Sequence, residues 1–189
     1  MEEKIRKILK ESISVKEALL KSGVKTLARI AEAIVEAVRC EKKVFIFGNG
    51  GSAADSQHIA AEFIGRFRKE RRPIPAIALT TNTSTLTALS NDYGYDVSFK
   101  RQLEALAVSG DIVIGLSTSG NSPNVYEALK AAKRLGLKIV TMTGEGGGRI
   151  AKLADIALKI PSENTPRIQE SHITAGHIIC ELVEEKLAK

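Results

Sequence analysis

Residues 44–55 read VFIFGNGGSAAD: an unbroken apolar run, a glycine-rich loop and the first turn of a helical pattern. An apolar run without alternation is typical of a strand that is buried on both faces of a sheet. Four further runs of this kind follow, at residues 76–79, 112–116, 138–142 and 156–160. Helical patterns separate them, notably over residues 53–66 and 123–135, and a last helical pattern covers residues 167–187.

Strands that alternate with helices predict an α/β fold with a parallel sheet, helices on both faces and right-handed crossovers. We therefore expect a three-layer αβα sandwich around a doubly wound, five-stranded parallel sheet. Before the first strand, residues 2–20 and 24–38 carry apolar side chains at helical spacing. The expected organisation is one domain over residues 1–189, with an N-terminal helical segment (1–40) and a parallel α/β core (41–189).

The composition is ordinary for a globular protein, with 43% apolar and 26% charged residues among 189. No apolar run reaches the roughly 18 residues of a membrane span, and the charged N-terminus MEEK leads into no signal-peptide region. We expect a cytoplasmic protein with no membrane partner. Cys40 and Cys180 lack metal or CxxC spacing and lie in apolar-periodic segments, so both are expected to be buried thiols.

The net charge of +6 is compatible with nucleic acid, with an anionic metabolite or with no specific partner. The one dense basic run, RFRKERR at residues 66–72, is short and includes Glu70. Aromatic residues make up only 4% of the chain and Trp is absent, which disfavours a base-stacking surface. We expect no nucleic-acid partner, and we interpret the run as a solvated helix end or a subunit contact.

Ligands of such sheets bind beyond the carboxyl ends of the strands, so the loops there are informative. In GNGGS at residues 48–52, three glycines let the backbone approach a ligand, and Ser52 is placed to cap a helix whose free N–H groups suit an anion or a hydroxyl. A tight strand–helix turn would use the same glycines. The loop matches neither the dinucleotide nor the P-loop pattern, so no nucleotide cofactor is expected.

The loop after the third predicted strand is richer in hydroxyl groups. It reads STSGNSP over residues 117–123, and Pro123 suits the first position of a helix. Hydroxyl groups beside free helix N–H groups form a phosphate site that needs no positive side chain. A polar cap alone would need one serine rather than four hydroxyl groups. Residues 144–148, GEGGG, have no such cluster and are interpreted as a structural turn.

Two helices carry candidates for chemistry. His58, Glu62 and Arg66 recur at every fourth residue and would share one helix face, although an exposed charged stripe has the same spacing. On the last helix, Gln169 and His177 lie about 80° apart around the axis and can converge on one pocket. His172 points about 140° away from His177, so we expect it to be structural or at the rim.

These motifs together resemble the phosphoheptose isomerases of the sugar-isomerase (SIS) superfamily over nearly the whole chain. The matching motifs are GNGGS at 48–52, QHIAAE at 57–62, ALSND at 88–92, STSGNS at 117–122 and RIQE at 167–170. The resemblance implies a flavodoxin-like SIS domain that assembles as a homotetramer with active sites between subunits. It also implies zinc, one per subunit, at His58, Glu62, Gln169 and His177, whose imidazole, carboxylate and amide groups are plausible ligands.

The remaining roles follow from the same resemblance. The residues implied to hold the phosphate are Ser117, Thr118, Ser119 and Ser122. The residues implied to contact the sugar chain are Asn49, Gly50, Gly51, Ser52, Asn91, Asp92 and Gln169, with Arg66 nearby. Glu62 and His177 would be the acid–base pair, with Glu62 also touching the substrate.

The implied reaction converts sedoheptulose 7-phosphate to D-glycero-D-manno-heptose 7-phosphate, the first step of ADP- or GDP-heptose biosynthesis for lipopolysaccharide. A proton must move between adjacent carbons through an enediol(ate), which a carboxylate and an imidazole can perform together. The alternative is a non-catalytic SIS adaptor that binds a replication initiator protein, although such adaptors typically lack the acid–base pair. A sugar-phosphate sensor domain would need a DNA-binding module, for which the chain has no spare region.

Overall fold

The core of the protein is a parallel sheet of five strands in the order β2-β1-β3-β4-β5. A computed structural model describes residues 1–188. The strands are β1 (Val44–Phe47), β2 (Ala76–Ala78), β3 (Ile112–Ser117), β4 (Lys138–Thr143) and β5 (Ile156–Lys159). This order is the flavodoxin-like arrangement of a doubly wound sheet, so the predicted fold class is confirmed. Each predicted strand is present, with its ends shifted by one residue at most.

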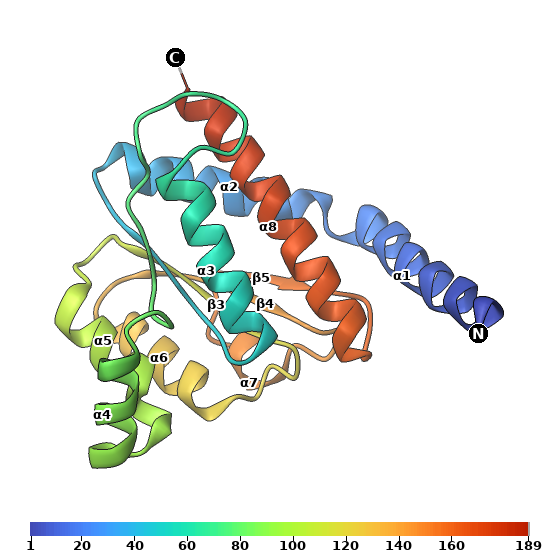
Figure 1. Ribbon diagram of the computed structural model, residues 1–189. Helices are drawn as coiled ribbons and strands as arrows, with labels where there is room; N and C mark the ends of the chain where they lie inside the picture. The colour runs from blue at the N-terminus through green and yellow to red at the C-terminus, as the bar shows by residue number, and fades with distance from the viewer. Residues whose placement is uncertain (189) are drawn as a thin grey trace.

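Helices cover both faces of the sheet (Figure 1). The helices are α1 (Glu2–Ser22), α2 (Val24–Arg39), α3 (Gly51–Ile64), α4 (Thr83–Tyr93), α5 (Ser98–Leu106), α6 (Pro123–Arg134), α7 (Gly148–Ala151) and α8 (Thr165–Leu187), with a 3₁₀ turn at Tyr95–Val97. In Figure 1, α2, α3 and α8 lie on one face, α5, α6 and α7 on the other, and α1 projects from the body.

Alternate residues of β1 show why its sequence is apolar throughout. Val44 and Ile46 belong to the hydrophobic core beneath α2, α3 and α8, whereas Phe45 and Phe47 belong to the core beneath α5 and α6. All four side chains are fully buried. A strand with helices on both faces is buried on both sides, which favours an unbroken apolar run.

Some local predictions were wrong. α3 begins at Gly51 with Gly50 as its N-cap, so Ser52 lies buried inside the first turn and does not cap the helix. α3 also ends at Ile64, two residues earlier than predicted. Cys180 is buried as predicted but Cys40 is exposed, because it follows the last turn of α2 at the protein surface. Among residues 1–188, no helix is both long and apolar enough to cross a membrane.

Candidate active site

Helices α3 and α8 lie against one another, and glycines allow the close approach (Figure 1). A Cβ atom added to Gly176 of α8 would lie 2.6 Å from Cδ1 of Ile59 on α3. A Cβ atom on Gly51 of α3 would lie 2.5 Å from Nε2 of Gln169 on α8. Both distances are shorter than carbon contacts allow, so the two helices present facing side chains across a very narrow gap.

Three predicted site residues meet in this gap. Nε2 of His58 lies 2.9 Å from Nε2 of His177 and 3.3 Å from Oε1 of Glu62. One nitrogen, one carboxylate oxygen and a second nitrogen from these residues all lie within 4.8 Å of one another. The ring of Phe67 packs on His177, with the ring centroids 5.6 Å apart. The two helices therefore place a carboxylate and two imidazoles around a single point.

The donor set fits a zinc ion. Zinc holds nitrogen and oxygen ligands at about 2.0–2.2 Å, which puts two ligand atoms of a tetrahedral site about 3.3 Å apart. The separations around His58, 2.9 and 3.3 Å, are near this value, and all three ligand atoms lie within 4.8 Å of one another. Gln169, the fourth candidate, lies two turns before His177 on α8 and packs over Gly51. His58, Glu62 and His177 could thus hold a metal, with Gln169 on the same side of α8.

The hydroxyl-rich loop leaves the carboxyl end of β3. Oγ of Ser117 lies 2.9 Å from Oγ of Ser122 and 3.5 Å from Oγ of Ser119. A pocket of about 290 Å³ opens beside the loop and is lined by Thr118, Ser119, Gly144, Glu145, Gly146, Ser162, Glu163, Thr165 and Ile168. Pro123 begins α6 directly after the loop, as predicted. Several hydroxyl groups therefore converge at the start of a helix, an arrangement that suits an anion without a positive side chain.

The glycine-rich turn at residues 144–148 supports the hydroxyl-rich loop. Gly120 has a φ of +67°, and a Cβ atom there would lie 2.2 Å from the carbonyl oxygen of Gly147. The Asn121 side chain accepts a hydrogen bond of 3.1 Å from the backbone N–H of Arg149. Residues 144–148 are thus a structural turn, as interpreted from the sequence, and this turn fixes the back of the hydroxyl-rich loop.

Two residues that the sequence did not single out hold Asn49 in place. The Asn49 and Asn124 side-chain amides donate to one another at 2.9 Å in both directions, and the Tyr95 hydroxyl donates to Oδ1 of Asn49 at 3.0 Å. Asn124 is almost fully buried, in the first turn of α6. Its place just after the hydroxyl-rich loop was the available signal. The amide pair joins the glycine loop after β1 to the first turn of α6, directly after the hydroxyl-rich loop.

Three other predicted site residues lie apart from the histidine cluster. Arg66 follows the end of α3 and forms a 2.9 Å ion pair with Glu70, so the predicted shared face with His58 and Glu62 is wrong for Arg66. Asn91 and Asp92 lie exposed at the end of α4, where the Asn91 amide donates to Asp92. Within the described chain, no hydrogen bond or ion pair joins these three residues to the cluster.

Two further titratable groups have shifted pKa values. Burial lowers the pKa of His172 to about 4, partly opposed by its contact with the Thr143 carbonyl, so His172 is neutral and structural. Burial raises the pKa of Asp55 to about 6, partly opposed by the nearby His58. Oδ2 of Asp55 is buried without a hydrogen-bond partner among residues 1–188. Asp55 precedes His58 by one helical turn and was not singled out from the sequence.

The fold and the loops define a class of protein: doubly wound α/β domains that bind their ligand at the carboxyl edge of the sheet. A family model described as the SIS domain matches residues 8–144. The phosphoheptose isomerase of Aquifex aeolicus is 53% identical over 189 residues, which are 100% of this chain and 99% of that protein. The phosphoheptose isomerase of Thermodesulfovibrio yellowstonii is 51% identical, over 99% and 93% of the two chains.

A solved structure of phosphoheptose isomerase from Neisseria gonorrhoeae superposes with a TM-score of 0.93 at 41% identity, covering 97% of this chain and 98% of the other. The protein therefore belongs to the phosphoheptose isomerase family of SIS-domain proteins. The full-length relatives carry the name of an enzyme, which favours catalysis over the adaptor alternative.

The contact between the hydroxyl-rich loop and the turn at residues 144–148 gives a first prediction. Replacing Gly120 with Ala should lower the free energy of unfolding by about 1–3 kcal/mol, because the new Cβ atom meets the Gly147 carbonyl and the φ is positive. Gly146→Ala is the control, since nothing lies within 4 Å of its added Cβ atom. Urea denaturation of both variants checks this, and equal losses of stability would contradict the packing.

The buried His172 gives a second prediction. Its pKa is about 4 in the folded protein against 6.5 for an ordinary histidine. Between these values the unfolded chain binds a proton that the folded chain does not, so stability should fall as the pH falls from 6.5 toward 4. His172→Gln should reduce this loss by up to about 1.4 kcal/mol per pH unit. Denaturation at several pH values checks this, and parallel curves for the two proteins would rule it out.

Proposed function

We propose that the protein interconverts sedoheptulose 7-phosphate and D-glycero-D-manno-heptose 7-phosphate, the first step toward a nucleotide-activated heptose. The observation that carries the proposal is the meeting of Glu62 with two imidazoles between α3 and α8. The relatives named phosphoheptose isomerase support the heptose substrate. Positioned proton transfer by each such group raises the reaction rate by about 10²–10⁴-fold. An isomerisation that forms no covalent bond to the enzyme depends on this proton transfer.

The phosphate is assigned to the hydroxyl-rich loop. Ser117, Thr118, Ser119 and Ser122 would donate their hydroxyl groups to phosphate oxygens at the start of α6. The hydroxyl-rich loop and the loop before α3 both follow the carboxyl ends of neighbouring parallel strands, β3 and β1. His58 and Glu62 lie seven and eleven residues beyond Gly51, which is about 10 and 16 Å along α3. A seven-carbon chain with its phosphate at C7 and its reaction at C1 and C2 would keep the phosphate apart from the reacting groups on α3.

The sugar hydroxyl groups are assigned to the surfaces between these two ends. Asn49, Gly50, Gly51 and Ser52 lie at the start of α3, and Gln169 packs over Gly51. The amide pair with Asn124 fixes which way the Asn49 amide faces the substrate. Binding of the chain in one orientation would place C1 and C2 beside Glu62 and His177.

The chemistry needs one base at carbon and one group at the oxygens. Glu62 takes the proton from C1 of the ketose and returns it to C2, so the carbon-bound proton moves by one position. His177 serves the oxygens, because O1 must lose a proton as it becomes a carbonyl and O2 must gain one. The enediol(ate) is the intermediate between these steps, and the product has the same atoms as the substrate. By microscopic reversibility, the same groups catalyse the reverse reaction.

His58, Glu62, Gln169 and His177 are the residues that would hold zinc. When bound, zinc would supply a Lewis acid for the sugar carbonyl. The donor atoms around His58 have the required spacing. Glu62 is thus proposed both as a zinc ligand and as the catalytic base. These two roles compete, because a carboxylate that is bound tightly to zinc is not free to accept a proton.

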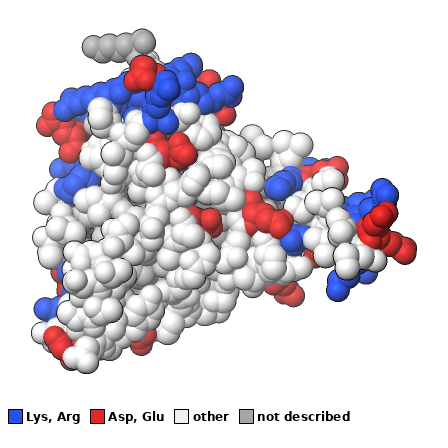
Figure 2. All heavy atoms as spheres, in the orientation of Figure 1, with Lys and Arg blue, Asp and Glu red and all other residues white. Residues whose placement is uncertain are grey.

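We also propose a homotetramer with active sites between subunits, in the cytoplasm, where a reducing environment would keep Cys40 and Cys180 as thiols. Arg66, Asn91 and Asp92 would then serve the site of a neighbouring subunit. α1 supports assembly, because it exposes Ile5, Ile8, Leu9, Ile13 and Leu20 on a projecting helix. Figure 2 shows that much of the face over α3 and α4 carries no charged side chains, which would favour contact with another copy.

Replacing Glu62 with Gln tests the base. The amide keeps the shape of the side chain but cannot accept the C1 proton, so kcat should fall by at least about 10²-fold. The affinity for sedoheptulose 7-phosphate should change by less than about threefold, as measured by calorimetry. Glu36→Gln on the exposed face of α2 is the matched control. Retained turnover in Glu62→Gln would sink the assignment.

The metal site is tested by zinc binding alone. The wild-type protein, freed of metal by a chelator, should bind one zinc ion per chain, and His58→Ala should lower that affinity by at least about tenfold. His172→Ala is the control, because His172 contacts the Thr143 carbonyl and not the cluster. Equal zinc affinity in His58→Ala and wild type would overturn this metal site.

A further inference from the structure

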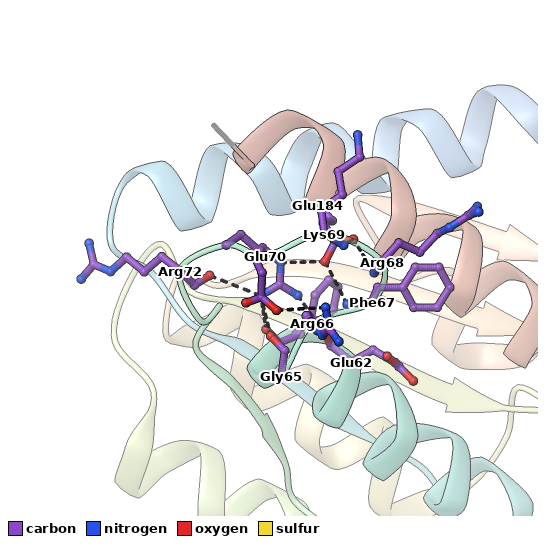
Figure 3. Close-up of polar contacts among 11 residues, drawn as sticks. Glu62, Gly65, Arg66, Phe67, Arg68, Lys69, Glu70, Arg72 and Glu184 are labelled. Carbon is purple, nitrogen blue, oxygen red and sulfur yellow. Dashed lines mark hydrogen bonds and ion pairs between the residues drawn. The ribbon is translucent and has the colours of Figure 1, made fainter.

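The loop after α3 is fixed to α8 by a buried carboxylate. Glu184 is 1% exposed and lies two turns after His177. Its carboxylate accepts three backbone N–H bonds, from Phe67 at 2.9 Å, Arg68 at 2.6 Å and Lys69 at 2.8 Å. Figure 3 shows Glu184 reaching from α8 to the backbone of this loop. Three successive N–H groups are thus held by one side chain.

Arg71 joins the same carboxylate to the end of α3. Its Nε lies 3.2 Å from Oε1 of Glu184, and the two side chains are 1% and 2% exposed. Its Nη1 donates to the carbonyls of Phe63 at 2.8 Å and Gly65 at 3.1 Å, and its Nη2 donates to the carbonyl of Glu62 at 2.8 Å. The last carbonyls of a helix have no partner within the helix, and a cation there also suits the helix dipole. Arg71 therefore terminates α3.

The charges of this pair are held in place by its surroundings. Burial alone would raise the pKa of Glu184, but the three N–H groups and Arg71 together bring it below its ordinary value. A buried ion pair adds little stability compared with apolar residues of the same size, whereas loss of one partner leaves an uncompensated charge. Here the pair also holds the carbonyls at the end of α3 through Arg71.

The atoms that the pair fixes belong to the candidate active site. Arg71 holds the backbone carbonyl of Glu62 itself. The N–H of Phe67 is bound to Glu184, and the Phe67 ring packs on His177. The Arg71–Glu184 pair therefore contacts both the end of α3, which carries Glu62, and Phe67, which packs on His177.

We propose that Arg71 and Glu184 are positioning residues of the isomerisation, acting through Glu62, Phe67 and His177 without touching the sugar. The proposal rests on the proposed function. The pair fixes the separation of the carboxylate from the imidazole across the α3–α8 gap, which proton transfer to adjacent atoms requires. Misplacement of reacting groups by about 1 Å can cost about 10²-fold in rate.

The test uses conservative variants of the full-length protein. Arg71→Lys keeps the charge but cannot span the Glu184 carboxylate and three carbonyls at once. Glu184→Asp keeps the carboxylate but shortens its reach by one carbon. Both variants should lower kcat by about 10- to 100-fold while KM changes by less than about threefold. The matched control is the exposed ion pair between the same loop and the same helix, Arg68 with Glu181 at 2.7 Å, so Glu181→Gln should keep kcat within about twofold.

A second readout does not depend on turnover. The chain has three histidines, so their ring resonances can be assigned by NMR. Arg71→Lys and Glu184→Asp should shift the ring signals of His58 and His177 and leave His172 unchanged, and Glu181→Gln should shift none. If wild type does not turn over sedoheptulose 7-phosphate, the proposed function fails, and the NMR comparison still decides the positioning role.

Other outcomes are also decisive. Wild-type kcat with unshifted His58 and His177 signals in folded Arg71→Lys would overturn the proposal. Loss of the cooperative urea transition in both variants would overturn it as well, because the pair would then hold the fold as a whole. A raised KM with unchanged kcat would assign the pair to binding instead, through Arg66, and would contradict the positioning of Glu62 and His177.

Discussion

The narrow gap between α3 and α8 is the constraint on which the rest of the site depends. Gly51 and Gly176 lack the Cβ atoms that would hold the helices apart, so Gln169 and Ile59 can fill the space beside them. Because the helices lie this close, residues at equivalent heights face one another, and His58 meets His177. The Arg71–Glu184 pair connects α8 to the C-terminal end of α3. Glycines therefore set the distance between the helices, and a buried ion pair sets where one of them ends.

The sheet was the most predictable part of the molecule. A central parallel strand is buried on both faces, and this burial favours an unbroken apolar sequence such as VFIF at β1. α4 left no such mark, because none of its residues is buried and no apolar period results. The convergence of His58, Glu62 and His177 needed two helices far apart in sequence to be placed side by side. Helical spacing made that contact possible but could not require it.

The errors have a common physical origin in tertiary contacts. Spacing alone put Arg66 on the same face as Glu62, but Gly65 and the Arg71 side chain end the helix first. The dense basic run at residues 66–72 was interpreted as a solvated helix end or a subunit contact, and most of it is exposed, yet the side chain of Arg71 inside it is almost fully buried. Asn124 and Tyr95 support Asn49 from separate segments. In each case the deciding partner lies outside the local sequence pattern.

The basic run at residues 66–72 lies far from the loop that is assigned to the phosphate. Residues 66–72 lead toward the amino end of β2, whereas residues 117–122 leave the carboxyl end of β3. The two segments therefore lie at opposite edges of the parallel sheet, and Figure 2 shows Lys and Arg gathered near the end of α8. The phosphate assigned to the hydroxyl-rich loop would be held by neutral donors and a helix start, so release of the product need not break an ion pair. The basic residues of the run at 66–72 lie instead at the end of the molecule where Arg71 meets Glu184.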